Sequence, residues 1–79
     1  MNLDAQIGAN VRRLRERAGY SQRELAERAA AWGHHLTQSA LARIEGAQRK
    51  LTFSEAWAFV VVAGGSFDDL CWIEDTEDS

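Results

Sequence analysis

Apolar side chains recur at every third or fourth position near the start of the chain, which is the spacing of one helical face. These positions are Ile7, Val11, Leu14 and Ala18. Asp4 is a suitable N-cap for such a helix, and Gly19 is the residue type that most often follows a helix end. The pattern therefore predicts a first helix between Asp4 and Gly19, with arginines on its outer face.

A second helix is predicted to begin at residues 21–24, which read Ser-Gln-Arg-Glu. In this capping box the serine hydroxyl and the glutamate carboxylate each satisfy a free backbone N–H of the new helix. Leu25, Ala29 and Trp32 follow at helical spacing, and Gly33 is a stop signal. We expect this helix to extend to Trp32, with His34, His35 and Leu36 forming the turn that follows.

The third predicted helix has one apolar and one polar face. Thr37 is a suitable N-cap, and Leu41 and Ile44 are three residues apart, so both point inward. At about 100° per residue the opposite face is short and rich in hydrogen-bonding groups. Its members are Gln38, at the flank of the first turn, Ser39 and Arg43. Such a free face is suited to recognising another molecule.

Residues 46–51 form a loop, and residues 52–55, Thr-Phe-Ser-Glu, are a second capping box that opens a fourth helix. The chain is continuously apolar from residue 56 to 63, and the Val60–Val62 triplet is also compatible with a buried strand. We prefer a helix, because no other segment reads as a partner strand. Gly64 and Gly65 end it, and a short fifth helix follows to about Cys71 or Ile73. The predicted fold class is all-α with five helices.

Size and composition limit the chain to one ordinary globular domain. It has 79 residues, of which 46% are hydrophobic and 27% are charged. The net charge of -3 is unevenly distributed. All nine basic residues lie between Arg12 and Lys50, whereas residues 67–79 carry six acids and no base. The chain thus combines a basic body with an acidic tail, which by itself supports a nucleic-acid partner only weakly.

Several classes of function are not expected from the composition. Cys71 is the single cysteine, so no internal disulfide can form, and we expect it to fill a small apolar space. His34 and His35 lack the paired spacing of a metal site, so we expect no metal and no cofactor. The longest apolar run is too short to span a membrane, and a cytoplasmic location is simplest. No nucleophile with a base and no glycine-rich phosphate loop is present, so we do not expect an enzyme.

Three segments together resemble a known family. They are "IGANVRRLRERAGYSQRELAERA", "LTQSALARIEG" and "LTFSEAWAFVVVAGGSFDDL". Their order and spacing are similar to those of the Cro and lambda-repressor-like helix-turn-helix domains, also called the xenobiotic-response-element family of bacterial and phage regulators. The resemblance covers residues 7–70. It implies a DNA-binding domain in which helices two and three form the helix-turn-helix.

The resemblance also implies roles for individual side chains on DNA. Gln38, Ser39 and Arg43, which the helical spacing already exposes, match residues that face base edges in the family. The residue matching Gln22 contacts a phosphate at the start of helix two. The expected contacts to the DNA backbone are made by Gln22, Arg12, Arg13, Thr37, Arg49 and Lys50.

Two segments depart from the family pattern. Between Ala26 and Leu36 the chain is about five residues longer than the usual tight turn, so we expect helix two to be extended by a turn. The loop after helix three usually reads Glu-Asn-Gly-Lys-Arg, whereas here residues 45–49 read Glu-Gly-Ala-Gln-Arg. The resemblance therefore does not by itself define the phosphate contacts of that loop.

The fourth helix carries more apolar residues than one inward stripe can hold. Some of them must face another surface, and a homodimer is the economical explanation, since it places two reading helices about 34 Å apart on DNA. The expected interface comprises Trp57, Phe59, Val62, Trp72 and Ile73. The alternative is that this surface binds a regulatory protein partner.

We expect residues 1–73 to form the helix-turn-helix domain and residues 74–79 to be an acidic C-terminal tail. The predicted function is sequence-specific binding of a pseudo-palindromic operator by a transcriptional regulator, more specifically a repressor. The alternative is a protein-interaction module of the same fold, such as an antitoxin or an antirepressor. DNA binding is preferred because the free face of helix three is polar.

Overall fold

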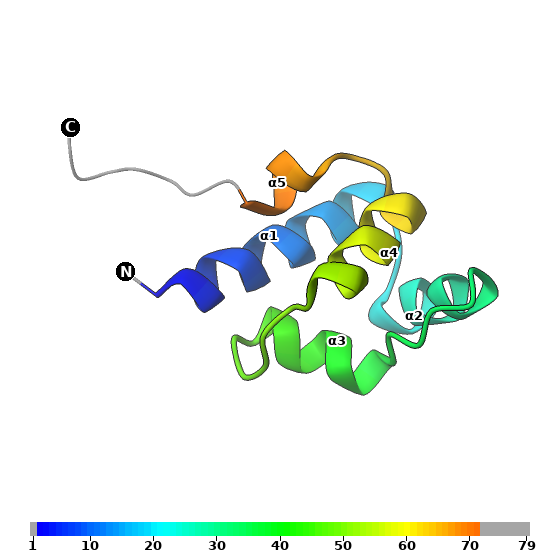
Figure 1. Ribbon diagram of the computed structural model, residues 1–79, viewed down its shortest axis with the longest axis horizontal. Helices are drawn as coiled ribbons and strands as arrows, with labels where there is room; N and C mark the ends of the chain where they lie inside the picture. Colours follow the sequence, from blue (N-terminus) through cyan, green and yellow to red (C-terminus); the bar gives the residue numbers. More distant parts are fainter. Residues whose placement is uncertain (1, 72–79) are drawn as a thin grey trace.

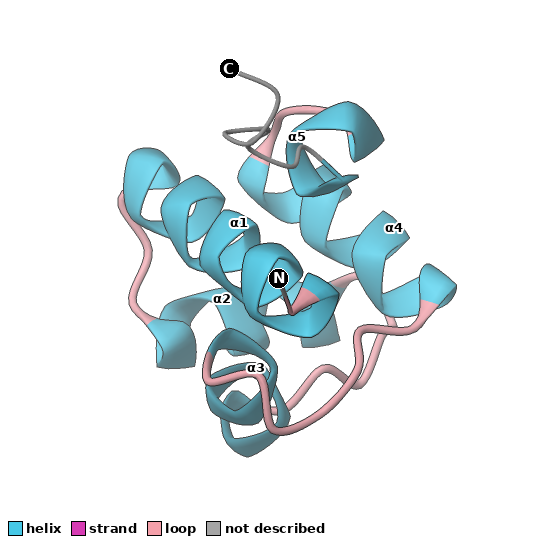
Figure 2. Cartoon of the chain, turned by 90° about the vertical axis from the view of Figure 1, so that its left-hand side faces the viewer, coloured by secondary structure: helices cyan, strands magenta, loops and turns pink. Residues whose placement is uncertain are grey.

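The computed structural model describes residues 2–71, and this part of the chain contains α-helices and no strand. The five helices are α1 (Leu3–Ala18), α2 (Gln22–Ala31), α3 (Gln38–Glu45), α4 (Phe53–Ala63) and α5 (Phe67–Cys71). In both views α1 lies between α5 on one side and α3 on the other (Figures 1 and 2). The predicted all-α class with five helices is confirmed. None of these helices is long and apolar enough to cross a bilayer.

A single core joins all five helices. Its most deeply buried large side chain is Phe59 of α4, which is completely inaccessible to solvent. Around it pack aliphatic side chains from the other four helices and from the turn before α3. The principal ones are Val11, Leu14, Leu25, Leu36, Leu41, Ile44 and Leu70. The burial of this apolar surface supplies most of the favourable free energy of folding.

The helix starts follow local side-chain chemistry. Both predicted capping boxes are present, one with Ser21 and Glu24 and the other with Thr52 and Glu55. The first helix begins earlier than expected, because Asn2 rather than Asp4 is its N-cap. The Asn2 Oδ1 accepts hydrogen bonds from the Asp4 N–H at 2.9 Å and the Ala5 N–H at 3.3 Å. Both Asn and Asp are strong caps, so sequence alone did not separate them.

The predicted inner face of helix two is wrong at its last position. α2 ends at Ala31, and Trp32 is its C-cap with 64% of its surface exposed. Because the chain leaves the helix there, the helical spacing no longer determines where this side chain points. The core position is taken instead by Leu36 in the following turn, which is 1% exposed. Cys71 is also exposed, so it does not fill an internal space as expected.

The Val60–Val62 triplet lies in α4, as predicted. The apolar residues of this helix that were expected to form a dimer interface do not all lie at the surface. Phe59 is fully buried in its own chain and is therefore unable to contact a partner, whereas Trp57 is 52% exposed. Val62 is half-buried and packs against the core. Trp72 and Ile73, like the boundary at residue 73, lie outside the described residues.

The loop between α3 and α4 is held by an ion pair with two hydrogen bonds. The Arg49 guanidinium donates to both carboxylate oxygens of Glu55, at 2.8 and 2.7 Å. The same carboxylate accepts the Thr52 backbone N–H at 2.9 Å. The guanidinium beside it and these hydrogen bonds lower the pKa of Glu55 from 4.5 to about 2, despite its burial.

α1 and the end of α3 approach each other closely at Gly8. A Cβ atom on Gly8 would lie 2.5 Å from the Ile44 carbonyl oxygen and 3.0 Å from that of Glu45. These are backbone atoms, so the clash could be relieved only by moving the whole end of α3. A glycine inside an otherwise regular helix usually has such a packing reason.

We predict that Gly8→Ala destabilises the domain by about 1–3 kcal/mol, although alanine is the better helix former by about 1 kcal/mol. Gly46→Ala is the matched control, since a Cβ there would have its nearest contact at 3.4 Å and the backbone φ is -88°. The control should change stability by less than about 0.5 kcal/mol. Urea unfolding followed by circular dichroism measures both. Equal stabilities of the two variants would contradict the close approach.

We also predict that the free energy of unfolding decreases as the pH is lowered, over a range set by the pKa of Glu55. Its folded pKa of about 2 lies below the ordinary 4.5, so the stabilisation is complete above pH 4.5 and disappears as the pH falls through 2. Glu55→Gln should remove about 2–3 kcal/mol of this pH dependence. Glu16→Gln, which changes a carboxylate in an exposed ion pair, is the control and should preserve the wild-type profile. Urea unfolding at pH 2 to 6 provides the measurement.

Candidate nucleic-acid interface

α3 is an eight-residue helix whose two faces differ sharply. Leu41 and Ile44 are 0% and 1% exposed and anchor it to the core, as predicted. The side opposite these anchors is open to solvent and carries the three predicted base-contacting residues. Gln38, Ser39 and Arg43 are all exposed. The three exposed residues therefore lie on one helix, α3, which is at the edge of the molecule (Figure 2).

The end of α3 is fixed by a buried ion pair to α1. The Arg15 guanidinium donates to Glu45 twice, from Nε to Oε2 at 2.6 Å and from Nη2 to Oε1 at 3.0 Å. Both side chains are about nine-tenths buried. The hydrogen bonds to Glu45 raise the pKa of Arg15, so this arginine stays charged under all ordinary conditions. Two parallel bonds restrict rotation of α3 about its own axis as well as its position.

The start of α2 joins the same carboxylate. Gln22 donates from Nε2 to the Glu45 Oε1 at 3.0 Å, and the Arg15 Nη1 donates to the Tyr20 carbonyl at 2.8 Å. Glu45 thus connects three helices, α1, α2 and α3. Gln22 is half-buried, and part of its amide is engaged inside the domain. Sequence analysis predicted Gln22 as a phosphate contact and did not identify this internal role.

The remaining candidates for DNA-backbone contact lie in different places. Arg12 and Arg13 are exposed on α1, where Arg12 pairs with Glu16 at 3.1 Å and Arg13 donates to Asn10. Thr37 is exposed and its hydroxyl accepts the Ala40 N–H at 3.1 Å, which confirms it as the N-cap of α3.

In the loop after α3, the charge of Arg49 is already matched by Glu55. Lys50 beside it has a largely exposed side chain that reaches Asp4 at 3.2 Å. The loop therefore offers one exposed cation rather than two.

Asn10 is a structurally important residue that sequence analysis missed. It is 1% exposed, and its Nδ2 donates to the Leu70 carbonyl at 2.8 Å, which ties α5 to α1. A signal for it existed in the sequence. Asn10 lies three residues after Ile7 and four before Leu14, so it occupies the apolar face of the helix. A polar residue at such a position is expected to make a buried hydrogen bond.

No group of three or more metal-ligating side chains occurs among residues 2–71. The polar atoms around α3 are instead hydrogen-bond donors and acceptors suited to recognition. The arrangement presents an amide, a hydroxyl and a guanidinium from one helix that is rigidly held at its other end. A major groove of DNA is wide enough to admit such a helix.

Comparison with known proteins agrees with this geometry. A family model described as a helix-turn-helix domain matches residues 6–70. No curated protein and no solved structure matches the chain. The matched range contains nearly all of the described helices, including α2 and α3 and the turn between them. Members of this family are typically not enzymes, and a helix-turn-helix domain indicates DNA binding and regulation of transcription. The chain therefore belongs to the helix-turn-helix domain family.

Proposed function

We propose that this protein is a sequence-specific transcriptional regulator that inserts α3 into the major groove of an operator. The observation that carries the proposal is the exposed polar face of α3, held in place by two buried aliphatic residues and by Glu45. Binding in the groove excludes other proteins from the same DNA, so repression is the expected outcome.

Each residue of this face has a chemical partner on DNA. An exposed glutamine such as Gln38 pairs with the N6 and N7 atoms of adenine, and Arg43 pairs with the O6 and N7 atoms of guanine. Ser39 donates to or accepts from either base. Ala42 is exposed on the same helix and is suited to contact a thymine methyl group. A good pair contributes about 1–3 kcal/mol of discrimination against the wrong base.

Sequence-independent affinity comes from exposed cations outside this face, on α1 and in the loop after α3. Arg12, Arg13 and Lys50 are exposed and suited to attract phosphates, with Thr37 and Gln22 adding hydrogen bonds. Arg49 contributes less, because its guanidinium is bound to Glu55. We therefore assign Arg49 chiefly to the structure of the loop.

We propose that the protein binds its operator as a homodimer. Two aromatic residues of α4 remain uncovered, since Trp57 is 52% and Phe53 is 77% exposed. The Phe53 ring stacks on Phe67 of α5, with centroids 5.4 Å apart. The Phe53 and Phe67 rings border an apolar groove of about 410 Å³, which Ile7, Leu51 and Cys71 also line. Exposed aromatic groups of this kind favour association with a second copy.

A protein-interaction module of the same fold is the second candidate. The uncovered aromatic residues Phe53 and Trp57 favour it, because they would serve a different protein as well as a second copy. In that case the polar face of α3 would have no partner. Variants of α3 therefore separate the two functions.

We predict that Arg43→Ala and Gln38→Ala each lose preference at one base pair, by about 5- to 150-fold, while binding to other sequences changes little. Arg12→Ala is the contrasting variant and should weaken binding to all sequences alike. The slope of log affinity against log salt concentration should fall by the amount expected for about one phosphate contact. Selection from a random duplex pool identifies the sites, and fluorescence anisotropy at several salt concentrations measures the affinities. A Gln38→Ala/Arg43→Ala double variant that binds as the wild type would exclude α3 as the reading element.

We predict that the wild type sediments at twice 8.8 kDa at micromolar concentration and that Trp57→Ser shifts it to 8.8 kDa. The dimer should dissociate because an aromatic ring that becomes buried at an interface contributes a large share of the binding energy. Trp32→Ser is the matched control, since Trp32 is also largely exposed, at 64%, but lies at the end of α2. A wild type that sediments only at 8.8 kDa, or a control that dissociates equally, would refute this interface.

A further inference from the structure

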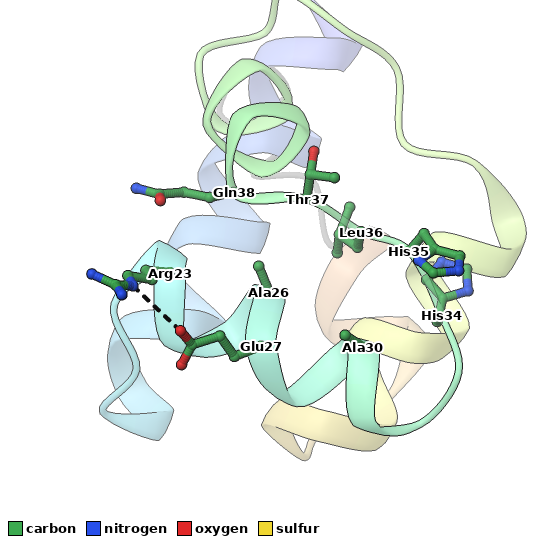
Figure 3. A pocket seen from close by; sticks show the side chains of 9 residues that line it. All are labelled: Arg23, Ala26, Glu27, Ala30, His34, His35, Leu36, Thr37 and Gln38. Atoms are coloured by element: carbon green, nitrogen blue, oxygen red, sulfur yellow. Dashed lines mark hydrogen bonds and ion pairs between the residues drawn. The ribbon is translucent and has the colours of Figure 1, made fainter.

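The segment between α2 and α3 forms one side of a second surface groove of about 290 Å³, close to the start of α3. Its floor is apolar and consists of Ala26, Ala30 and Leu36, from α2 and the turn (Figure 3). Arg23, Glu27 and Gln38 border one end, and His34 and His35 border the other. The groove exists because the chain continues through six residues after Ala31 before α3 begins at Gln38.

Gln38 belongs both to the polar face of α3 and to the wall of this groove. In the close view its amide lies on the same side as the Arg23 guanidinium (Figure 3). A long molecule in contact with the polar face of α3 would therefore pass directly along the mouth of the groove. The groove is thus an extension of the interface and not a separate site.

The charge at the mouth is available to an anion. Arg23 pairs with Glu27 at 3.3 Å, but their side chains are 77% and 64% exposed. Such a solvent-exposed pair is weak, so a phosphate can readily displace the carboxylate from the guanidinium.

The lining also indicates a large ligand. Ala30 is exposed and Ala26 is half-buried, so the floor is shallow and open. Sites for small molecules usually enclose 70–90% or more of their ligand, which this floor does not do. The edge of a long polymer needs no such enclosure. A DNA strand offers the matching chemistry, since apolar deoxyribose rings alternate with anionic phosphates.

We propose that this groove binds the sugar–phosphate backbone of the DNA strand that flanks the bases read by α3. A deoxyribose packs over Ala26 and Ala30, and the adjoining phosphate accepts hydrogen bonds from Arg23. The lengthened turn thereby enlarges the footprint of the domain beyond the half-site. This inference rests on the proposed DNA-binding function.

The experiment changes charge inside and just outside the groove. Ala30 and Ala31 are neighbouring exposed alanines in the last turn of α2, but only Ala30 lines the groove. We compare Ala30→Glu and Ala30→Lys with Ala31→Glu and Ala31→Lys on a duplex selected by the wild type. Fluorescence anisotropy at several salt concentrations gives the affinity, and circular dichroism checks that each variant folds.

Ala30→Glu should weaken binding about tenfold, and Ala30→Lys should tighten it. The Ala30→Lys variant should also have a steeper slope of log affinity against log salt concentration, by the amount expected for about one more phosphate contact. Both substitutions at Ala31 should change affinity less than about threefold, because their charges lie farther from the strand. Hydroxyl-radical footprinting should show that Ala30→Glu loses protection of the flanking nucleotides while the central bases stay protected.

Equal effects at the two positions, or no effect of Ala30→Glu, would overturn the groove proposal. In that case the α3 variants would still lose base preference, and DNA recognition by α3 would stand. A wild type that selects no duplex would instead refute the proposed function itself. The two failures are therefore distinguishable.

Discussion

The buried contact between Arg15 and Glu45 determines how α3, the proposed reading helix, is oriented in the domain. Two nearly buried charges lose much of their hydration, and the paired hydrogen bonds at 2.6 and 3.0 Å offset that cost. Removing one partner of such a pair typically costs about 3–5 kcal/mol. Because Glu45 is the last residue of α3 and also accepts from Gln22, the contact fixes the helix against α1 and α2 at once. Its chief effect is on orientation.

This arrangement separates the surfaces that hold α3 from the exposed polar face that we propose recognises DNA. The anchors, Leu41, Ile44 and Glu45, and the close approach at Gly8 all lie on the inner side or at the C-terminal end. The exposed amide, hydroxyl and guanidinium can therefore be replaced without disturbing the fold. Asn10 performs a comparable task for α5, because its buried hydrogen bond to the Leu70 carbonyl adds to the packing of Leu70 in the core.

The structure also changes the electrostatic interpretation of the basic body of the chain, residues 12–50. Two of its nine cations, Arg15 and Arg49, are committed to carboxylates inside the domain, and both pairs are largely buried. The charge that can attract phosphate is correspondingly smaller than the sequence suggests. Exposed pairs such as Arg23 with Glu27 differ, because solvent screening keeps them weak and exchangeable. Burial thus decides which arginines support the fold and which remain available to a ligand.

The sequence by itself determined the features that depend on neighbouring residues. The capping boxes at Ser21 and Thr52, the cap at Thr37 and the inward pair Leu41 and Ile44 follow from bonds and spacings within one helix. Only the tertiary structure decided that Leu36 replaces Trp32 in the core, that Phe59 is buried while Trp57 is exposed, and that Gly8 admits the end of α3. These outcomes depend on contacts between segments distant in the chain, where helix direction and available space, rather than local propensity, determine which side chain fits.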